Sequence, residues 1–257
     1  MKLEELVAAL DLPSSCRVDQ RVPKKLLIEN AAMTPKDKRQ INECIEGIQW
    51  LAALKPNSVG VAEYRDNVRE YLEIAILIVT CKETDGKTFN IVRLVELLHR
   101  AIPYPMLLLF QWEQKIMLST GHKRMAQNEA GKVILDGNIV AVTLPEDALT
   151  TPVEIAFKQA LALRQQPQAT LYTLYQGWMD ILYALLVARI TSTFIVAESP
   201  EQADYRRQAL EDYKGLESEA ARLRAKAMKE KQLSTQVELN LALRVVQTKM
   251  ADALDRL

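Results

Sequence analysis

The stretch YLEIAILIVT, from Tyr71 to Thr80, is the clearest β-strand in the sequence and decides the fold. Successive side chains of a strand point to opposite faces. The two apolar sets of this stretch are Leu72, Ile74, Ile76 and Ile78 on one face, and Ala75, Leu77 and Val79 on the other. Because both faces are apolar, we expect a central strand in a sheet that is covered on both sides.

The sequence that follows this strand predicts a helix and two more strands. Apolar residues repeat at helical spacing from Ile91 to Leu98, and Pro103 ends the predicted helix. The apolar run 106–110 predicts a strand, and residues 115–119 are expected to pair back onto it. Residues 132–135 and 139–144 flank Asp136-Gly137-Asn138, a sequence typical of a β-hairpin turn.

A helix start precedes the central strand. In Thr34-Pro35, the threonine can accept hydrogen bonds from free backbone N–H groups, and the proline suits the first helical turn. Asp37 adds a negative charge where the helix dipole favours one. We expect this helix to run to about Glu46 and a strand to follow from Ile48 to Leu54.

Beyond Pro152 the sequence predicts only helices. Two helices are expected over 153–164 and 170–197, and Ser199-Pro200-Glu201 is expected to start a charged helical tail. The predicted fold class is therefore α+β: a mixed α/β domain over 1–148, a helical extension over 149–198, and a coiled-coil-like helical tail over 199–257.

The tail carries two apolar stripes with the 3-and-4 spacing of a coiled-coil seam. They consist of Tyr213, Leu216, Ala220, Leu223 and Ala227, and of Leu239, Leu243, Val246, Met250, Ala253 and Leu257. The stripes are out of phase, so the helix either shifts its buried face near Gln232–Gln236 or turns back as a hairpin. A seam needs a covering helix, which is either the protein's own core or another chain. The predicted partner interface comprises Leu216, Leu223, Leu239, Leu243, Val246, Met250 and Leu257.

The composition excludes several classes of protein. Its 33 Lys plus Arg balance 33 Asp plus Glu among 257 residues, and 49% of the residues are hydrophobic, as in a folded chain and not a disordered one. The three cysteines, Cys16, Cys44 and Cys81, lie far apart and suggest neither a disulfide framework nor a metal site. Two histidines are too few for a multi-histidine metal site, and we expect no cofactor.

The location of the protein is predicted from its apolar segments. The first ten residues lack the basic start and long apolar run of a signal peptide. The stretch Ile181–Ala197 holds Arg189 and is shorter than the roughly 20 residues of a membrane span, so it is expected to be a buried helix. With the scattered cysteines, these features favour a cytoplasmic protein.

Two short motifs point to phosphate or metal chemistry. Asp85-Gly86-Lys87-Thr88 resembles the end of a phosphate-binding loop, but Cys81 stands where that loop needs its first glycine, which favours a plain turn. Glu113 and Lys115 have the Glu-x-Lys spacing of many nucleases. A second carboxylate is needed for Mg²⁺, and Asp85 is the nearest upstream candidate. The alternative for Glu113 and Lys115 is a solvated hairpin end.

Basic residues form a possible nucleic-acid surface. Lysine and arginine neutralise phosphates without reading bases. The predicted contact residues are Lys24, Lys25, Lys36, Lys38, Arg39, Lys123 and Arg124, provided that the fold brings the two groups together. A solvated charged face is the alternative.

Several motifs in fixed order resemble one protein family. They are Val22-Pro23-Lys24-Lys25-Leu26-Leu27-Ile28-Glu29-Asn30, Ile48-Gln49-Trp50, Glu73-Ile74, Ala101-Ile102-Pro103-Tyr104, Lys229-Glu230-Lys231-Gln232 and Val237-Glu238-Leu239-Asn240. Together they resemble the bacterial domain of unknown function 4391, from about Val22 to Leu257. The resemblance implies a gene encoded beside helicases and DNA methyltransferases of phage-defence islands, and it carries over no catalytic residues.

The tail seams favour a non-enzymatic accessory or assembly subunit, and the resemblance implies that it belongs to a phage-defence complex. The expected partners are other protein chains, either a second copy or a helicase or methyltransferase subunit, held through the C-terminal helices, with DNA as a possible further partner and no membrane. Two alternatives remain: a divergent Mg²⁺-dependent nuclease that uses Glu113 and Lys115, and a sequence-independent DNA-binding module.

Overall fold

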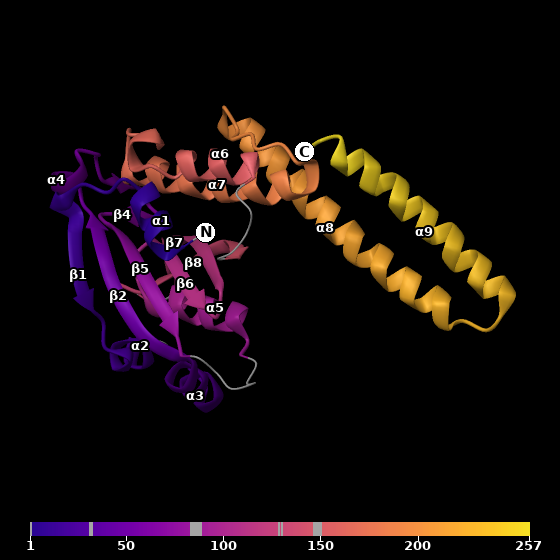
Figure 1. Cartoon of the computed structure of the whole chain (residues 1–257), viewed down its shortest axis with the longest axis horizontal. Helices are drawn as coiled ribbons and strands as arrows, with labels where there is room; N and C mark the ends of the chain where they lie inside the picture. The colour runs from indigo at the N-terminus through magenta and orange to yellow at the C-terminus, as the bar shows by residue number, and fades with distance from the viewer. Residues whose placement is uncertain (1, 31–32, 83–88, 128, 130, 146–150) are drawn as a thin grey trace. The chain divides into compact units, whose positions relative to one another are not determined.

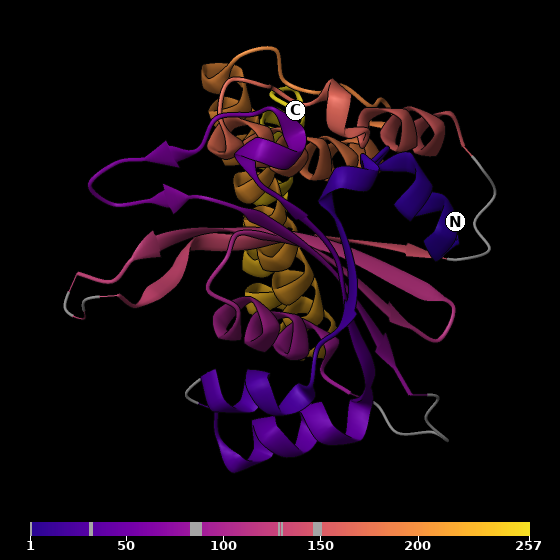
Figure 2. The same cartoon turned by 90° about the vertical axis from the view of Figure 1, so that its left-hand side faces the viewer.

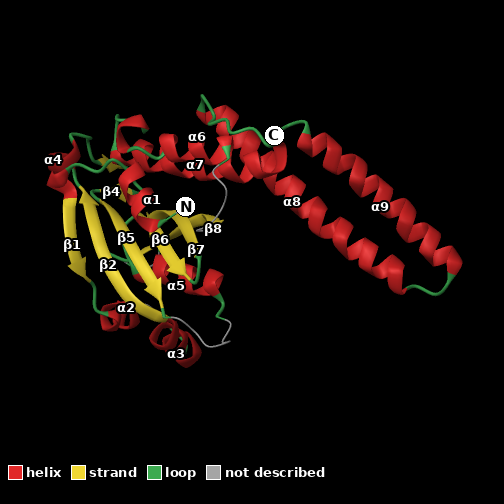
Figure 3. Cartoon of the chain, in the orientation of Figure 1, coloured by secondary structure: helices red, strands yellow, loops and turns green. Residues whose placement is uncertain are grey.

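The computed structural model describes residues 2–30, 33–82, 89–127, 129, 131–145 and 151–257. The chain divides into two compact units, Met1–Leu182 and Tyr183–Leu257. Figures 1 and 3 show the course of the chain and its secondary structure. Asp85 lies outside the described residues, so the expectation for its turn and for its carboxylate is not addressed by the structure.

The first unit alternates short helices with strands. Its elements are α1 (Leu3–Ala9), the 3-10 helix η1 (Ser14–Cys16), β1 (Arg17–Arg21), α2 (Lys24–Asn30), α3 (Pro35–Cys44), β2 (Ile45–Leu54), α4 (Pro56–Val59), β3 (Tyr64–Arg65), β4 (Glu70–Tyr71), β5 (Ile74–Cys81), α5 (Ile91–Ala101), β6 (Met106–Trp112), β7 (Lys115–Met125), β8 (Val133–Pro145), α6 (Pro152–Ala160), the 3-10 helix η2 (Leu163–Gln165) and the first part of α7 (Leu171–Thr191).

The central strand lies in the middle of the sheet as predicted, but it begins at Ile74: Tyr71 belongs to β4, and Leu72 lies outside the strand and is 38% exposed. Six strands form one sheet in the order β1-β2-β5-β6-β7-β8, and β3 and β4 form a separate two-stranded sheet. Strand β5 lies between β2 and β6 and is buried from Ile74 to Val79. It pairs with β6 in parallel, with α5 connecting the two, whereas the other pairs of the large sheet are antiparallel.

Helices cover both faces of this sheet, so both predicted faces of β5 are buried. Figure 2 shows α2, α3 and α5 below the sheet, and α1, α6 and α7 above it. Ala75, Leu77 and Val79 join one apolar cluster with residues of α2, α3 and α5. The alternation read from the sequence is therefore confirmed in the core of the first unit.

The predicted hairpin at Asp136-Gly137-Asn138 is wrong. These residues lie inside the single long strand β8, which pairs with β7 on both sides of them. The register shifts between Thr120 and His122 of β7, and Gly137 has a φ of 79°, so the glycine serves a bulge and not a turn. A tight hairpin turn and a β-bulge of this kind both need a residue with φ > 0, so the local sequence did not distinguish them.

Helix boundaries follow their caps. Thr34 and Asp37 form the predicted capping box at the start of α3, which ends at Cys44, two residues before the predicted end. Helix α6 ends at Ala160 and α7 at Thr191, both earlier than expected. None of the described helices combines the length and hydropathy that a membrane crossing requires.

The second unit contains the end of α7 and a helical hairpin. Helix α8 (Pro200–Lys229) begins at the N-cap Ser199, as predicted, and α9 (Leu233–Leu254) follows after three residues. The two helices pack against each other, as Figure 1 shows. Of the two alternatives for the tail, the hairpin is therefore the observed one.

Candidate functional site

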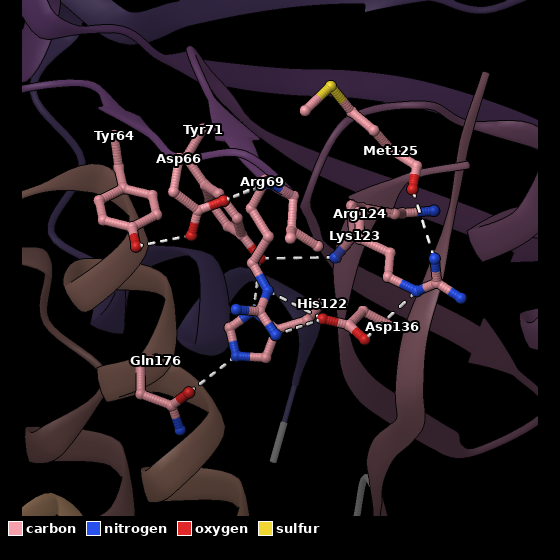
Figure 4. A network of polar contacts seen from close by, with 11 residues as sticks. Tyr64, Asp66, Arg69, Tyr71, His122, Lys123, Arg124, Met125, Asp136 and Gln176 are labelled. Atoms are coloured by element: carbon pink, nitrogen blue, oxygen red, sulfur yellow. Dashed lines mark hydrogen bonds and ion pairs between the residues drawn. The ribbon is translucent and has the colours of Figure 1, made fainter. Parts of the chain in front are cut away.

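A network of polar side chains joins the β3–β4 hairpin to β7, β8 and α7 (Figure 4). It begins at the Asp66 carboxylate, which accepts hydrogen bonds from the backbone N–H groups of Val68 (2.7 Å) and Arg69 (2.6 Å) and from the Tyr64 hydroxyl (2.8 Å). These bonds lower the pKa of Asp66 and fix the turn that carries Arg69.

Arg69 connects this turn to the large sheet. Its Nε and Nη2 atoms donate to Asp136 Oδ2 at 2.8 and 2.5 Å, and Arg124 lies on the other oxygen, with Nε 3.6 Å from Oδ1. Asp136 therefore sits between two guanidinium groups. The Arg69 guanidinium also lies 5.8 Å from the ring centre of Tyr172 in α7, within the range of a cation–π contact.

Tyr71 and His122 lie at the centre of the network. The Tyr71 hydroxyl contacts His122 Nδ1, and Gln176 Oε1 lies 2.7 Å from His122 Nε2. Gln176 Nε2 in turn donates to Asp180 Oδ1 at 2.8 Å. Because Gln176 Oε1 is an acceptor, His122 donates to it from Nε2.

Aromatic rings complete the same region. Tyr172 stacks on Tyr64 at 4.8 Å between ring centres, and on His122 at 5.1 Å. Burial, followed by the neighbouring Tyr175, raises the pKa of Tyr71 far above that of an exposed phenol. Tyr71 is therefore a neutral hydrogen-bonding group and not an activated nucleophile, and the network holds the hairpin and α7 against β7.

A second polar group is buried beside the network. Lys123 is 2% exposed, and its ammonium donates to the backbone carbonyl oxygens of His99 and Ile102, at the end of α5. Burial lowers the pKa of Lys123 to about 8. Burial and then the Lys123 charge lower the pKa of His99 to about 3, so His99 is neutral, and its Nε2 lies 3.0 Å from Ser119 Oγ.

The residues predicted for nuclease chemistry lie at the turn between β6 and β7. Glu113 has a φ of 48°, and Lys115 pairs with Trp112 across the turn; both side chains are exposed. Within the described part of the chain, no group of three or more His, Cys, Asp or Glu side chains is placed to hold a metal ion. Glu113 and Lys115 therefore lie at an exposed turn, and the nuclease assignment stays a prediction.

The predicted basic residues occupy different environments. Lys24 Nζ donates to the backbone carbonyl oxygen of Ile45 at 2.8 Å, where it binds the end of α3, and burial lowers its pKa. Lys25 and Arg39 pair with acidic residues of their own helices, whereas Lys36 and Lys38 are exposed on α3.

The other basic pair differs from the expectation. Lys123 lies in the interior, because its ammonium satisfies the carbonyl groups at the end of α5, so a phosphate-contacting surface role does not fit its position. Arg124 is about one-third exposed but is directed to Asp136 and to the Met125 carbonyl oxygen.

The predicted interface residues mostly line the inside of the helical hairpin. Leu216, Ala220 and Leu223 of α8 pack in one cluster with Leu239, Leu243, Val246 and Met250 of α9. Of the two alternatives for covering the seam, the chain's own structure is the observed one, because α8 and α9 cover each other. At the chain end, the Leu257 carbonyl oxygen accepts a hydrogen bond from Arg206 Nε at 2.8 Å.

The opposite side of α9 carries an apolar stripe that the sequence reading missed. Its four side chains recur every fourth residue, which places them along one side of a helix. Their exposed fractions are 74% for Leu233, 50% for Val237, 57% for Leu241 and 57% for Val245. We call these four residues the outer stripe. Their spacing was a usable signal, but the seam residues at interleaved positions of the same helix obscured it.

The structure also brings together two cysteines that appeared unrelated in the sequence. Cys44 ends α3 and Cys81 ends β5, and their sulfur atoms lie 2.6 Å apart. Their separation of 37 residues left no local pattern from which the contact could be predicted.

Comparisons with known proteins identify a family. The model of a family described as a domain of unknown function (DUF4391) matches residues 10–250. No curated protein and no solved structure matched the chain. Because the match covers most of the 257 residues and includes the sheet, the polar network and most of the hairpin, this chain belongs to the DUF4391 family.

Proposed function

We propose that this protein is a non-enzymatic assembly subunit that docks a helix of another protein on the outer stripe of α9. The observation that carries the proposal is the exposure of Leu233, Val237, Leu241 and Val245, each at least half exposed, on a helix whose other side is already packed. A helix that is apolar on two opposite sides leaves one of them in water unless a second element covers it.

The neighbouring helix supports this interpretation by contrast. The exposed positions of α8 are mainly charged or polar, as at Glu211, Lys214 and Glu217, which suits a solvated face. Fully burying a valine or leucine side chain is favourable by about 1.5–3 kcal/mol. A partner that covers the outer stripe therefore gains several kilocalories per mole of binding free energy from it. An amphipathic helix with apolar residues at 3-and-4 spacing has the matching shape.

The family resemblance favours a particular partner. It implies genes beside helicases and DNA methyltransferases, so we propose a helicase or methyltransferase subunit of a bacterial phage-defence complex, in the cytoplasm, as the source of the docking helix. A second copy of this chain is the competing occupant.

The test replaces the outer stripe without disturbing the seam. In the full chain, Val237→Glu combined with Leu241→Glu should abolish capture of the co-expressed helicase or methyltransferase encoded beside this gene, because two carboxylates cannot be buried in an apolar contact. Gln247→Glu adds charge at another exposed position of α9 and should leave capture unchanged. Circular dichroism should show the same helix content in all three proteins.

Light scattering decides between the two occupants. A wild-type protein that is monomeric alone and captured by a neighbouring subunit supports the proposal. A dimer that the double substitution dissociates assigns the outer stripe to a second copy instead. Equal capture of wild type and the double variant contradicts docking through α9.

A second candidate function rests on α3. Lys36 and Lys38 are exposed there, and neither forms an ion pair with the described residues. Their ammonium groups are therefore available to contact DNA phosphates. We propose sequence-independent DNA contact at this helix as an accessory role. It predicts affinity that falls steeply with salt and weakens further in Lys36→Glu/Lys38→Glu, and a flat salt response contradicts it.

A further inference from the structure

The two adjacent thiols of Cys44 and Cys81 form a site that the assembly role does not use. Cys44 is fully buried, whereas Cys81 is partly exposed. Their sulfur atoms lie 2.6 Å apart, about half an ångström more than the roughly 2.05 Å of a disulfide bond.

The backbone fixes both residues at this distance. Ile45 pairs with Cys81 in the β2–β5 ladder, and the Lys82 N–H donates to the Cys44 carbonyl oxygen at 2.8 Å. The end of α3 and the end of β5 are therefore joined on both sides of the thiol pair. Oxidation requires only small side-chain movements, with the ladder left in place.

The surroundings favour one thiol as the nucleophile. The Cys81 thiol, which hydrogen-bonds to the Cys44 sulfur, and secondarily the Lys82 ammonium lower the pKa of Cys44 against the opposing effect of burial. The same contact, together with burial, raises the pKa of Cys81. Lys82 is held nearby because its Nζ donates to the Asn42 carbonyl oxygen at 3.1 Å.

We propose that Cys44 and Cys81 are a peroxide-oxidisable dithiol that closes to an intramolecular disulfide. Hydrogen peroxide enters beside the partly exposed Cys81, and the Cys44 thiolate attacks one peroxide oxygen: the O–O bond breaks, Cys44 becomes a sulfenic acid, and the hydroxide that leaves takes up the Cys81 proton as the first water. The Cys81 thiolate formed in this way then attacks the Cys44 sulfur, the S–O bond breaks, and hydroxide leaves and takes up a proton from solvent as the second water. Two thiols are oxidised by two electrons, and the peroxide is reduced.

Cys16 provides a matched control in the same chain. It is 2% exposed, and its Sγ donates to the Pro13 carbonyl oxygen at 3.0 Å. It is therefore a buried thiol whose contact is a backbone oxygen and not a second sulfur. Peroxide treatment of the native protein should leave it reduced.

The test counts thiols in the full-length protein after hydrogen peroxide treatment and removal of excess oxidant. Under denaturing conditions, thiols should fall from three to one in the wild type and from two to none in Cys16→Ser. The intact mass should fall by two hydrogens without a change in oligomeric state. Tryptic mapping without reduction should link the peptide Gln40–Arg65 to the peptide Glu70–Lys82.

Each remaining outcome bears on the proposal. Cys44→Ser and Cys81→Ser should form no intramolecular disulfide, and if either fails to fold, the peptide map of Cys16→Ser decides the question alone. Retention of all three thiols in the wild type at peroxide concentrations that oxidise free cysteine overturns the proposal. A disulfide that involves Cys16, or one that links two chains, overturns it as well.

Discussion

The Arg93 guanidinium binds the Asp37 carboxylate through two hydrogen bonds, from Nε to Oδ1 at 3.2 Å and from Nη2 to Oδ2 at 3.1 Å. The same carboxylate accepts hydrogen bonds from the Thr34 hydroxyl and backbone N–H at the start of α3. One side chain therefore caps α3 and ties it to α5. The bonds from Arg93 and then those from Thr34 lower the pKa of Asp37 to about 2.

Replacing Arg93 should weaken the acid sensitivity that this pair confers. An unfolded chain binds a proton at Asp37 near pH 4, and the folded chain binds it only near pH 2. The pair's contribution is therefore complete above pH 4 and is lost as the pH falls from about 4 to about 2. Urea unfolding over this window should show a smaller loss of stability in Arg93→Gln than in wild type.

An exposed arginine of the same helix serves as the control for Arg93. Arg100 pairs only with Glu96 among the described ion pairs and is about half exposed, so Arg100→Gln should follow the wild-type pH profile. If stability falls equally with pH in wild type and in Arg93→Gln, the Arg93–Asp37 ion pair does not cause the loss of stability in acid.

Lys123 should make the protein more stable as the pH rises. The folded chain releases the Lys123 proton near pH 8 and the unfolded chain near pH 10.5, so between these values the unfolded chain binds more protons. At about 1.4 kcal/mol per pKa unit, burying the charge costs about 3 kcal/mol below pH 8, and this cost disappears by pH 10.5. Lys123→Met removes the titrating group, so its stability should lack this rise.

The comparison needs a lysine that is not buried. Lys115 is exposed at the β6–β7 turn, and Lys115→Met should keep the alkaline rise of the wild type. Denaturant unfolding at pH 7.5, 9 and 10.5 would measure all three proteins. A rise of equal size in Lys123→Met would assign the rise to groups other than Lys123.

Tyr71→Phe should destabilise the first unit by about 1–3 kcal/mol. The substitution removes the hydroxyl that contacts His122 Nδ1 and accepts from the Lys123 backbone N–H at 3.4 Å, while it keeps the ring contacts. Tyr104→Phe, at a tyrosine that is 41% exposed, should change stability by less than about 0.5 kcal/mol. Similar losses in both variants would mean that the hydrogen bonds of Tyr71 contribute little.

Local sequence signals predicted the elements but not the contacts between them. The alternation of Ile74 to Val79 and the cap at Thr34 were read correctly because both depend on residues a few positions apart. Asp136-Gly137-Asn138 was misread because a bulge and a tight turn require the same backbone freedom, and only pairing along the whole of β7 selects the bulge.

The candidate sites depend on longer-range contacts. Tyr71 and His122 are 51 residues apart and Cys44 and Cys81 are 37 apart, so a single sequence gives no periodic signal for either pair. Both tail stripes were visible as repeats, but their role depended on whether the helix turned back. Once it does, the two stripes face each other and Leu241 is left on the outside.

Gly177 of α7 should resist substitution because the chain passes very close to it. A Cβ atom at this position would lie 2.7 Å from Gln166 Oε1 and 2.7 Å from Pro167 Cδ. Gln166 is buried, and its Nε2 already donates to the carbonyl oxygens of Ala160 (2.7 Å) and Ala162 (3.0 Å), so it cannot move freely. Gly177→Ala should lower the free energy of unfolding by about 1–3 kcal/mol, measured by denaturant titration.

Gly215 of α8 tests this reasoning in the same chain, because nothing lies within 4 Å of a Cβ atom built there. Alanine restricts the unfolded chain and favours a helix by about 1 kcal/mol over glycine, so Gly215→Ala should stabilise the helical hairpin. Helix propensity alone predicts the same gain at Gly177. If Gly177→Ala lowers the free energy of unfolding and Gly215→Ala raises it, the loss at Gly177 comes from the close packing of Gln166 and Pro167 against α7. A gain in stability at both positions would show that Gln166 and Pro167 move aside to accommodate the added methyl group.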